Sequence, residues 1–257
     1  VLEAAGLART NERGPYDFFR GRLMIPIRDL PQRDQPGRVL GFGARRLSDD
    51  DPDAPKYVNT PETRVFHKGR VVYALDRALP VVRRSGHIVL MEGYTDVMAA
   101  HQVGLAQCVA VLGTATTEDH AALIQRSGAR RVTLLFDGDA AGRKAAWKAL
   151  SGLVHLDLKI DVVALTGGDD PCDVLVREGA APLVAGFELA TDWFAFALQG
   201  LADLRGIELS RAVEPLLELV ERVARPVQRE SLYNELSREL RISVAALREE
   251  SKRLRGG

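Results

Sequence analysis

Two acidic clusters follow apolar runs of strand length in this sequence. Glu92 comes directly after residues 87–91, and Asp137 and Asp139 flank a glycine after residues 131–136. Helix-forming sequence begins immediately after each cluster. Because the carboxyl ends of parallel strands share one edge of a sheet, we expect these carboxylates to converge there. Unpaired buried carboxylates are costly, whereas a hard divalent cation takes oxygen ligands readily. The sequence therefore predicts a metal site.

A second interpretation of these acidic residues stays open. An Asp at a strand end is commonly the N-cap of the next helix, where it accepts backbone N–H hydrogen bonds. For either cluster alone, capping explains the pattern as well as a metal does. The second cluster favours metal, because a cap needs one acidic residue and Asp137 and Asp139 supply two. Asp96, one helical turn beyond Glu92, either faces the same site or is a solvated helix residue.

A strand–helix rhythm between residues 86 and 185 positions the acidic residues. The predicted strands cover residues 88–91, 108–112, 132–136 and 159–165, and the predicted helices cover residues 94–103, 117–125 and 142–153. Thr116 and Asp119 have the spacing of a capping box at the start of the second helix. Strands that alternate with helices predict a mostly parallel sheet with right-handed connections.

The segments on either side have different patterns. Residues 1–85 indicate small strands and ordered loops, with residues 23–27 pairing with residues 38–42. After Gly186 the strand signal disappears and helices are predicted. Their apolar faces are Val213, Leu216, Leu217, Val220 and Val223 before Pro226, and Leu232, Leu236 and Leu240 before a third helix capped by Ser243. We therefore expect three units, residues 1–85, 86–185 and 186–257.

Charge is distributed unevenly among these units, although the 257 residues have no net charge. Residues 1–85 carry 16 Lys and Arg against 11 Asp and Glu, a net of +5. Residues 86–185 carry 8 against 12, a net of −4, and residues 186–257 carry 11 against 12. A basic lobe beside an acidic one fits an enzyme that holds a polyanion on one side and metal ions on the other.

Cys108 and Cys172 are isolated, which excludes a disulfide framework and a Cys-x-x-Cys zinc site. We therefore expect a reduced, cytoplasmic setting. No stretch is long and apolar enough to span a membrane, so no membrane partner is expected. Val1 begins in what the pattern indicates is the middle of a domain, and the start is neither a signal peptide nor a Met. We expect the chain to be a fragment of a larger protein.

The motifs resemble one enzyme family in their order. Glu-Gly-Tyr-Thr-Asp at residues 92–96, Leu-Gly-Thr-Ala-Thr-Thr at 112–117 and Asp-Gly-Asp-Ala-Ala-Gly-Arg at 137–143 resemble the TOPRIM domain of bacterial DnaG-type DNA primases. Upstream segments are similar to the RNA polymerase core of that family, in the right order: residues 22–29, 41–45, 56–63 and 66–69. The TOPRIM signature is shared with topoisomerases and some nucleases, whereas the basic upstream segments are specific to primases.

The resemblance implies an α/β fold, in which a TOPRIM-type parallel sheet flanked by helices carries a small mixed basic N-terminal lobe and a C-terminal helical subdomain. It implies RNA primer synthesis on single-stranded DNA, in which the 3′-hydroxyl of one ribonucleotide attacks the α-phosphate of the next and pyrophosphate leaves. Ribonucleoside triphosphates and two or more Mg²⁺ or Mn²⁺ ions are implied as substrates and cofactors. A zinc-binding domain before residue 1 and a domain binding the replicative helicase after residue 257 are implied as well.

The resemblance also assigns roles to residues. It implies Glu92, Asp137 and Asp139 as catalytic metal ligands, with Glu92 a candidate proton acceptor, and Asp170 as a further metal ligand. It implies nucleotide and template contacts for Arg45, Lys56 and Lys68. Asn59, in the same loop as Lys56, is a candidate to hydrogen-bond a phosphate or sugar, and Asp96 is a further candidate for nucleotide or template binding.

Residues 168–173 depart from the family pattern Gly-acid-Asp-Pro-Asp, because Cys172 replaces the second Asp. Pro171 biases Asp170 toward an extended conformation, so we expect Asp170 to project toward the edge that carries Asp137. Asp173 is expected to cap a helix over residues 174–177, and Cys172 to be a small packed side chain.

Two rival functions remain. One is another TOPRIM enzyme, and the other is a DNA-binding scaffold that keeps the carboxylates without turnover. A topoisomerase needs a tyrosine nucleophile in a separate cleavage domain, and none of the five tyrosines has that context.

Overall fold

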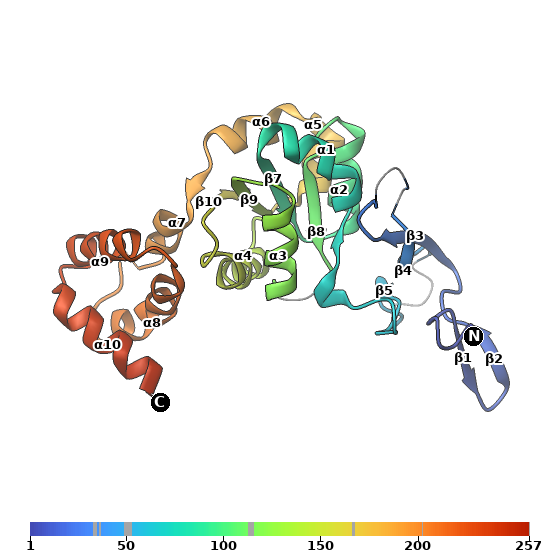
Figure 1. Ribbon diagram of the computed structural model, residues 1–257, viewed down its shortest axis with the longest axis horizontal. Coiled ribbons are helices and arrows are strands. Elements are labelled where there is room, and N and C mark those ends of the chain that lie inside the picture. Colours follow the sequence, from blue (N-terminus) through green and yellow to red (C-terminus); the bar gives the residue numbers. More distant parts are fainter. Residues whose placement is uncertain are drawn as a thin grey trace.

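The computed structural model describes residues 1–256 except 33, 34, 36, 49–52, 113–115, 166, 167 and 202. Three parts follow one another along the long axis of the molecule (Figure 1). A strand-rich lobe holds the N-terminus, a six-stranded sheet between helices lies in the middle, and a group of helices holds the C-terminus (Figure 1). This is the α/β arrangement predicted from the sequence.

The central sheet has the strand order β11-β10-β9-β7-β8-β6. Its four inner strands are parallel to one another, and the two edge strands are antiparallel to their neighbours. The strands are β6 (Val72–Tyr73), β7 (His87–Met91), β8 (Cys108–Val111), β9 (Arg131–Phe136), β10 (Lys159–Ala164) and β11 (Thr191–Asp192). The four predicted strands are confirmed. The short β11 was not foreseen after Gly186, because two residues are too few to show a strand pattern.

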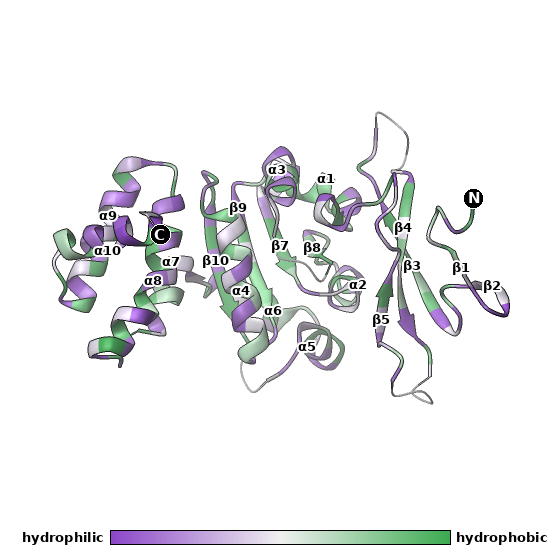
Figure 2. Ribbon diagram, turned by 90° about the horizontal axis from the view of Figure 1, so that it is seen from below, coloured by the Kyte–Doolittle hydropathy of each residue, from purple (hydrophilic) through white to green (hydrophobic). Residues whose placement is uncertain are grey.

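Helices cover both faces of this sheet. One face packs against α1 (Leu75–Ser85), α3 (Glu118–Arg126) and α4 (Ala140–Leu153), and the other packs against α2 (Tyr94–Gln102), α5 (Pro171–Glu178) and α6 (Ala181–Glu188). In β7, Ile88 and Leu90 belong to the first core and Val89 and Met91 to the second, all of them fully buried. Burial on both faces explains why the inner strands are mostly apolar (Figure 2).

The N-terminal lobe contains two antiparallel sheets. β1 (Ala8–Asn11) and β2 (Gly14–Asp17) form a hairpin, and β3 (Arg22–Arg28), β4 (Val39–Arg46) and β5 (Tyr57–Asn59) form the second sheet. The predicted pairing of residues 23–27 with the strand that begins near residue 38 is confirmed, with Ile27 opposite Gly41. The lobe packs on the central sheet through a small core in which Ile25, Ile27 and Phe66 meet Tyr94 and Leu112.

The C-terminal part is helical, as predicted. It consists of α7 (Trp193–Gln199), α8 (Gly206–Arg222), α9 (Pro226–Leu240) and α10 (Val244–Gly256). The apolar face predicted for α8 is buried, and Ser243 Oγ accepts a hydrogen bond from the Ala246 N–H (3.2 Å), as expected of the cap of α10. In the described ranges, no helix has the length and apolar character that crossing a membrane requires.

The boundaries at residues 85 and 185 stay a prediction about sequence segments. β6 and α1 lie before the first boundary, and β11 and α7 lie after the second. All four nevertheless contact strands of the central sheet.

Candidate metal centre and nucleotide interface

The predicted acidic residues lie at the carboxyl ends of neighbouring parallel strands. Glu92 directly follows β7, Asp137 directly follows β9, and Asp139 precedes α4. Asp170 precedes α5, in the connection that follows β10. Because β9 lies between β7 and β10, these side chains gather at one edge of the sheet. We call this group, together with Asp96 of α2, the acidic edge.

Two residues of the acidic edge are also N-caps of helices, and a third, Asp96, completes the capping box of α2 by accepting from the Gly93 N–H at 3.0 Å. The Oδ1 atom of Asp139 accepts a hydrogen bond from the Gly142 N–H, and Oδ1 of Asp170 accepts one from the Asp173 N–H, each at 2.7 Å. The two interpretations left open by the sequence are therefore compatible, since each cap uses one oxygen and leaves Oδ2 for another ligand. The expectation that Asp173 caps α5 is wrong. Pro171 is the first helical residue, because its fixed φ suits that position, and this makes Asp170 the cap.

Burial and mutual repulsion raise the pKa values at the acidic edge. Burial, together with the charges of Asp137 and Asp170, raises the pKa of Asp96 to about 6. Burial and then Asp137 raise the pKa of Glu92, and burial, Asp170 and Asp139 raise that of Asp137. Asp96 is only 7% exposed, so it is not a solvated helix residue. Carboxylates that repel one another in a partly buried site suit a cation.

Glu92 supplies a direct test of whether a metal fits. Its Oε1 atom is buried and has no hydrogen-bond partner in the described part of the chain. An unsatisfied buried oxygen is costly, and a bound cation would satisfy it. The oxygen donors of Glu92, Asp137, Asp139 and Asp170 are the ligands that Mg²⁺ and Mn²⁺ prefer. The residues present therefore fit a divalent metal.

Cys172 contributes a sulfur atom to the acidic edge. Ligand atoms of Cys172, Asp96 and Asp170 all lie within 4.8 Å of one another. The thiol packs partly against the second core, as expected, but its position beside two carboxylates was not foreseen. Burial, followed by the charges of Asp96 and Asp170, raises its pKa. The thiol is therefore neutral when no metal is bound.

Two of the cations proposed for nucleotide contacts, Arg45 and Lys56, lie at the second sheet of the N-terminal lobe. Arg45 is on β4, and Lys56 directly precedes β5. The Arg45 guanidinium and the Lys56 Nζ lie 5.9 and 6.0 Å from the ring centroid of Tyr57. Arg45 is close enough to Cys172 for its charge to lower the pKa of that thiol, against the larger effect of burial. The lobe therefore presents positive charge next to the carboxylates.

Asn59 is held by a residue that sequence reasoning did not select. The Tyr94 hydroxyl donates a hydrogen bond to Asn59 Oδ1 at 2.6 Å, which orients the amide and leaves its nitrogen to donate to a ligand. The Tyr94 ring lies against Gly43, where a Cβ atom would come within 2.4 Å of it. Tyr94 thus joins α2 to β4 and β5. Its place in the motif Glu-Gly-Tyr-Thr-Asp, between two acidic residues of the site, was the available signal.

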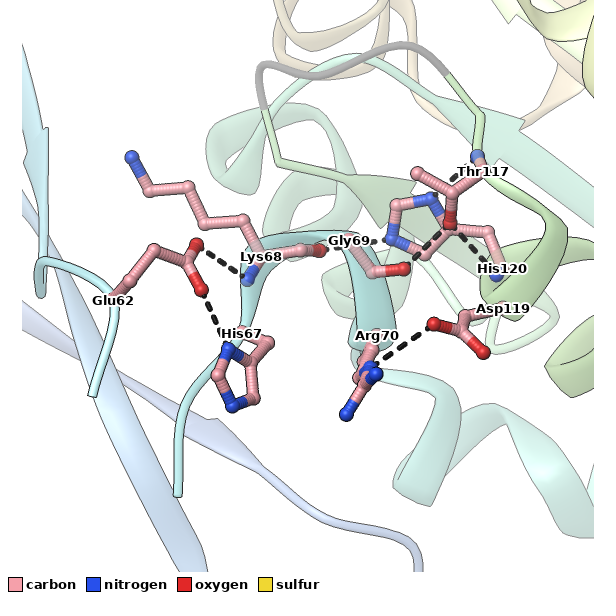
Figure 3. A network of polar contacts seen from close by, with 8 residues as sticks. All are labelled: Glu62, His67, Lys68, Gly69, Arg70, Thr117, Asp119 and His120. Atoms are coloured by element: carbon pink, nitrogen blue, oxygen red, sulfur yellow. Dashed lines mark hydrogen bonds and ion pairs between the residues drawn. The ribbon is translucent and has the colours of Figure 1, made fainter. Parts of the chain in front are cut away.

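Lys68 begins a 3-10 turn, η1 (Lys68–Arg70), which docks on the start of α3 (Figure 3). The cap of α3 is Thr117 and its partner is His120, so the predicted pair Thr116 and Asp119 is wrong by one residue. Thr117 Oγ1 accepts from the His120 N–H (3.1 Å), and His120 Nδ1 accepts from the Thr117 N–H (3.2 Å). An imidazole can complete a capping box in place of a carboxylate, which sequence reasoning did not consider. Residues 113–115 of the predicted motif lie outside the described residues.

A parallel sheet with Glu92 and the Asp137-Gly-Asp139 pair at adjacent strand ends defines a TOPRIM domain, and the Toprim domain model matches residues 86–164. The model of the DNA primase catalytic core, N-terminal domain, matches residues 1–79. A primase domain from Pseudomonas aeruginosa is 34% identical, with a TM-score of 0.85 over 98% of this chain and 78% of that one. A DnaG primase catalytic domain bound to single-stranded DNA is 37% identical, with a TM-score of 0.80 over 95% and 77%. The chain belongs to the DnaG family of DNA primases.

Full-length relatives are considerably longer than this chain. The DNA primase of Streptomyces coelicolor is 41% identical over 202 residues, which are 77% of this chain and 31% of that protein. The DNA primase of Deinococcus radiodurans is 37% identical over 225 residues, which are 87% of this chain and 38% of that protein. The chain therefore spans about a third of the length of these relatives.

Proposed function

We propose that this chain is the catalytic core of an enzyme that makes RNA primers on single-stranded DNA during replication. In this reaction the 3′-hydroxyl of one ribonucleotide attacks the α-phosphate of the next, and pyrophosphate leaves. The observation that carries the proposal is the acidic edge itself. Glu92, Asp96 and Asp137 have raised pKa values there, and a lobe carrying Arg45 and Lys56 lies beside them.

The metal would be held by Glu92, Asp137, Asp139 and Asp170, and we propose two or more Mg²⁺ or Mn²⁺ ions. Such ions, when bound, lower the pKa of the attacking hydroxyl and stabilise charge on the attacking and leaving oxygens. Glu92 has a raised pKa, which suits a group that takes up the proton of that hydroxyl. Asp96 is buried, its carboxylate lies within 4.8 Å of a carboxylate oxygen of Asp170, and it adds negative charge to the same edge.

The N-terminal lobe would hold the polyanions. We propose that Arg45, Lys56 and Lys68 bind phosphates of the incoming ribonucleoside triphosphate or of the template strand. The amide nitrogen of Asn59 is suited to donate to a phosphate or a sugar. One relative has been solved with single-stranded DNA, and a primase domain of Mycobacterium tuberculosis with double-stranded DNA, which supports a DNA ligand here.

Further features of the proposal come from the resemblance to primases. We propose that residues 1–85, 86–185 and 186–257 are the functional units, and that the replicative helicase binds a domain outside this sequence. A reduced, cytoplasmic setting fits the free thiols of Cys108 and Cys172.

The decisive experiment mixes the protein with a single-stranded template, Mg²⁺ or Mn²⁺ and labelled ribonucleoside triphosphates. The expected product is short RNA that depends on the template and on Asp137. Cleaved or relaxed DNA would instead identify another TOPRIM enzyme. Binding without a product, in both metals, would identify a DNA-binding scaffold.

A further inference from the structure

Lys68 is fixed at both ends of its backbone. Its N–H donates to Glu62 Oε1 at 3.0 Å, and its carbonyl oxygen accepts from His120 Nε2 at 2.9 Å. Its side chain extends away from this network, and no ion pair involves its ammonium group in the described part of the chain (Figure 3). A lysine with a fixed backbone and an unpaired ammonium group is prepared to meet an anion, because less conformational entropy remains to be lost on binding.

His120 makes its two contacts through opposite sides of one imidazole ring. Nδ1 accepts a hydrogen bond from the Thr117 N–H, so the ring proton must be on Nε2, which donates it to the Lys68 carbonyl oxygen. The side chain is fully buried, and burial lowers the pKa of His120, so the ring is neutral. One tautomer is therefore selected, and it is the tautomer that holds Lys68.

A second set of contacts joins η1 to α3, beside the hydrogen bond from His120 to the Lys68 carbonyl oxygen. Thr117 Oγ1 donates to the Gly69 carbonyl oxygen at 2.5 Å, and Arg70 pairs with Asp119 at 3.1 Å on the surface. These contacts join η1 to α3, whose Ile124 is fully buried in the core that also contains β7 and β9. The position of Lys68 is therefore set by the same layers that hold Glu92 and Asp137 at the acidic edge.

We propose that His120 is a positioning residue for Lys68. Its Nε2–H fixes the Lys68 backbone relative to the sheet, so that the ammonium group meets a phosphate held at the acidic edge. The proposal rests on the proposed function in one respect, namely that Lys68 binds phosphate. Two sources share this chemistry, the triphosphate of an incoming ribonucleotide and the backbone of the template strand.

Two substitutions at one position separate the two contacts of His120. The side-chain amide of Gln extends to where Nε2 lies and can still donate to the Lys68 carbonyl oxygen. The shorter Asn places its amide where Nδ1 lies, beside the Thr117 N–H, and does not reach Lys68. His120→Gln should therefore still position Lys68, whereas His120→Asn should not.

The measurement is direct binding, without turnover. Dissociation constants are determined for a non-hydrolysable ribonucleoside triphosphate with Mg²⁺ and, separately, for a fluorescent single-stranded oligonucleotide. Each is measured in the wild-type and Lys68→Ala backgrounds. His120→Asn should weaken at least one ligand by a factor on the order of ten, as Lys68→Ala does, and should have no further effect in the Lys68→Ala background. His120→Gln should stay within about twofold of wild type. The ligand that is weakened identifies the source of the phosphate.

Several outcomes would overturn the proposal. If His120→Asn weakens binding equally with and without Lys68, the residue acts independently of Lys68. Equal losses of affinity in the Asn and Gln variants would show that the hydrogen bond to Lys68 is not what matters. Normal binding of both ligands by Lys68→Ala would show that Lys68 does not bind phosphate. Either result would overturn the proposal. If His120→Asn does not fold, Thr117→Val removes both the hydrogen bond to the Gly69 carbonyl oxygen and the one accepted from the His120 N–H, and the cycle with Lys68→Ala is repeated. Loss of binding that persists in the Lys68→Ala background would again overturn the proposal. Failure of the proposed function looks different: no RNA product would form, whatever the binding cycle shows.

Discussion

The acidic edge and the helical C-terminal part use carboxylates in opposite ways. In the C-terminal part, Glu221 Oε1 accepts from the Tyr233 hydroxyl at 2.6 Å, and Oε2 pairs with Arg255 at 3.2 Å. Burial acts to raise the pKa of Glu221, but these partners outweigh it and the pKa is lowered. At the acidic edge, neither Glu92 nor Asp137 pairs with a cation in the described part of the chain, and their pKa values are raised.

This difference separates residues that stabilise the fold from residues kept for a ligand. A paired carboxylate favours the folded state when it is ionised, whereas clustered carboxylates oppose folding until a cation neutralises them. Substitutions at the acidic edge should therefore reduce activity and keep stability, whereas substitutions in the C-terminal part should reduce stability and keep activity.

The largest effect is expected at Asp137. Asp137→Asn removes a charged ligand, so nucleotidyl transfer should fall by a factor on the order of 100 or more. Because Asp137 is repelled by Asp170 and Asp139, thermal stability without metal should hold or rise. Primer yield and the unfolding midpoint in EDTA measure both effects. A primer yield close to that of wild type would show that Asp137 is not a metal ligand needed for the reaction.

Stability without metal should fall as pH rises through the range in which Asp96 ionises. Its pKa of about 6 in the folded state lies above the unfolded value of 3.8, so the folded state binds more protons between these pH values. The contribution to the free energy of unfolding is at most about 3 kcal/mol, and it is lost between about pH 4 and pH 6.

Urea unfolding in EDTA at a series of pH values tests this expectation. Asp96→Asn should remove the part of the decrease in unfolding free energy with pH that Asp96 contributes. Saturating Mg²⁺ should make this pH dependence weaker in wild type, because a cation favours the ionised form. The slope expected of Glu221 has the opposite sign, since its lowered pKa makes stability fall as pH drops below about 4.5. An unchanged slope in Asp96→Asn would show that this carboxyl is not perturbed.

In the C-terminal part, Tyr233→Phe should reduce stability and leave the chemistry intact. The variant loses the hydrogen bond to the Glu221 carboxylate, which should lower the free energy of unfolding by about 1.5–3 kcal/mol. Below the unfolding midpoint, primer synthesis should equal that of wild type, because Tyr233 lies in the helical part and not at the acidic edge. A loss of primer yield in the folded variant would mean that the two regions are coupled.

The smallest effect distinguishes Asp170, the N-cap of α5, from Asp173 in the first turn of that helix. Asp170→Asn keeps the helix cap, since Asn caps about as well as Asp, but it removes a charge from the metal site. The metal concentration at half-maximal primer synthesis should rise by about tenfold. Asp173→Asn is the matched control and should not shift this midpoint, because only the backbone N–H of Asp173 is used in the cap. If Asp173→Asn shifts the metal concentration more than Asp170→Asn does, the metal ligand is Asp173.

The sequence by itself determined the strands and the acidic residues at their ends. The run from Ile88 to Met91 is continuously apolar because both faces of β7 are buried, and such a run can be recognised without knowledge of its neighbours. Asp137 and Asp139 then follow from the rule that ligands gather at the carboxyl ends of parallel strands. The predicted sheet, its flanking helices and the C-terminal helices depend on the same local periodicities.

Only the tertiary structure decided which side chains meet across long separations. Cys172 lies beside Asp96, Tyr94 holds Asn59, and His120 holds Lys68, although 35 or more residues separate the members of the last two pairs. The cap of α3 is Thr117 rather than Thr116, and Thr117 also contacts η1 through the Gly69 carbonyl oxygen, a contact that only the tertiary structure shows. Local propensity cannot specify such contacts, because they depend on how the N-terminal lobe packs against the sheet, and that packing is determined by the whole buried core.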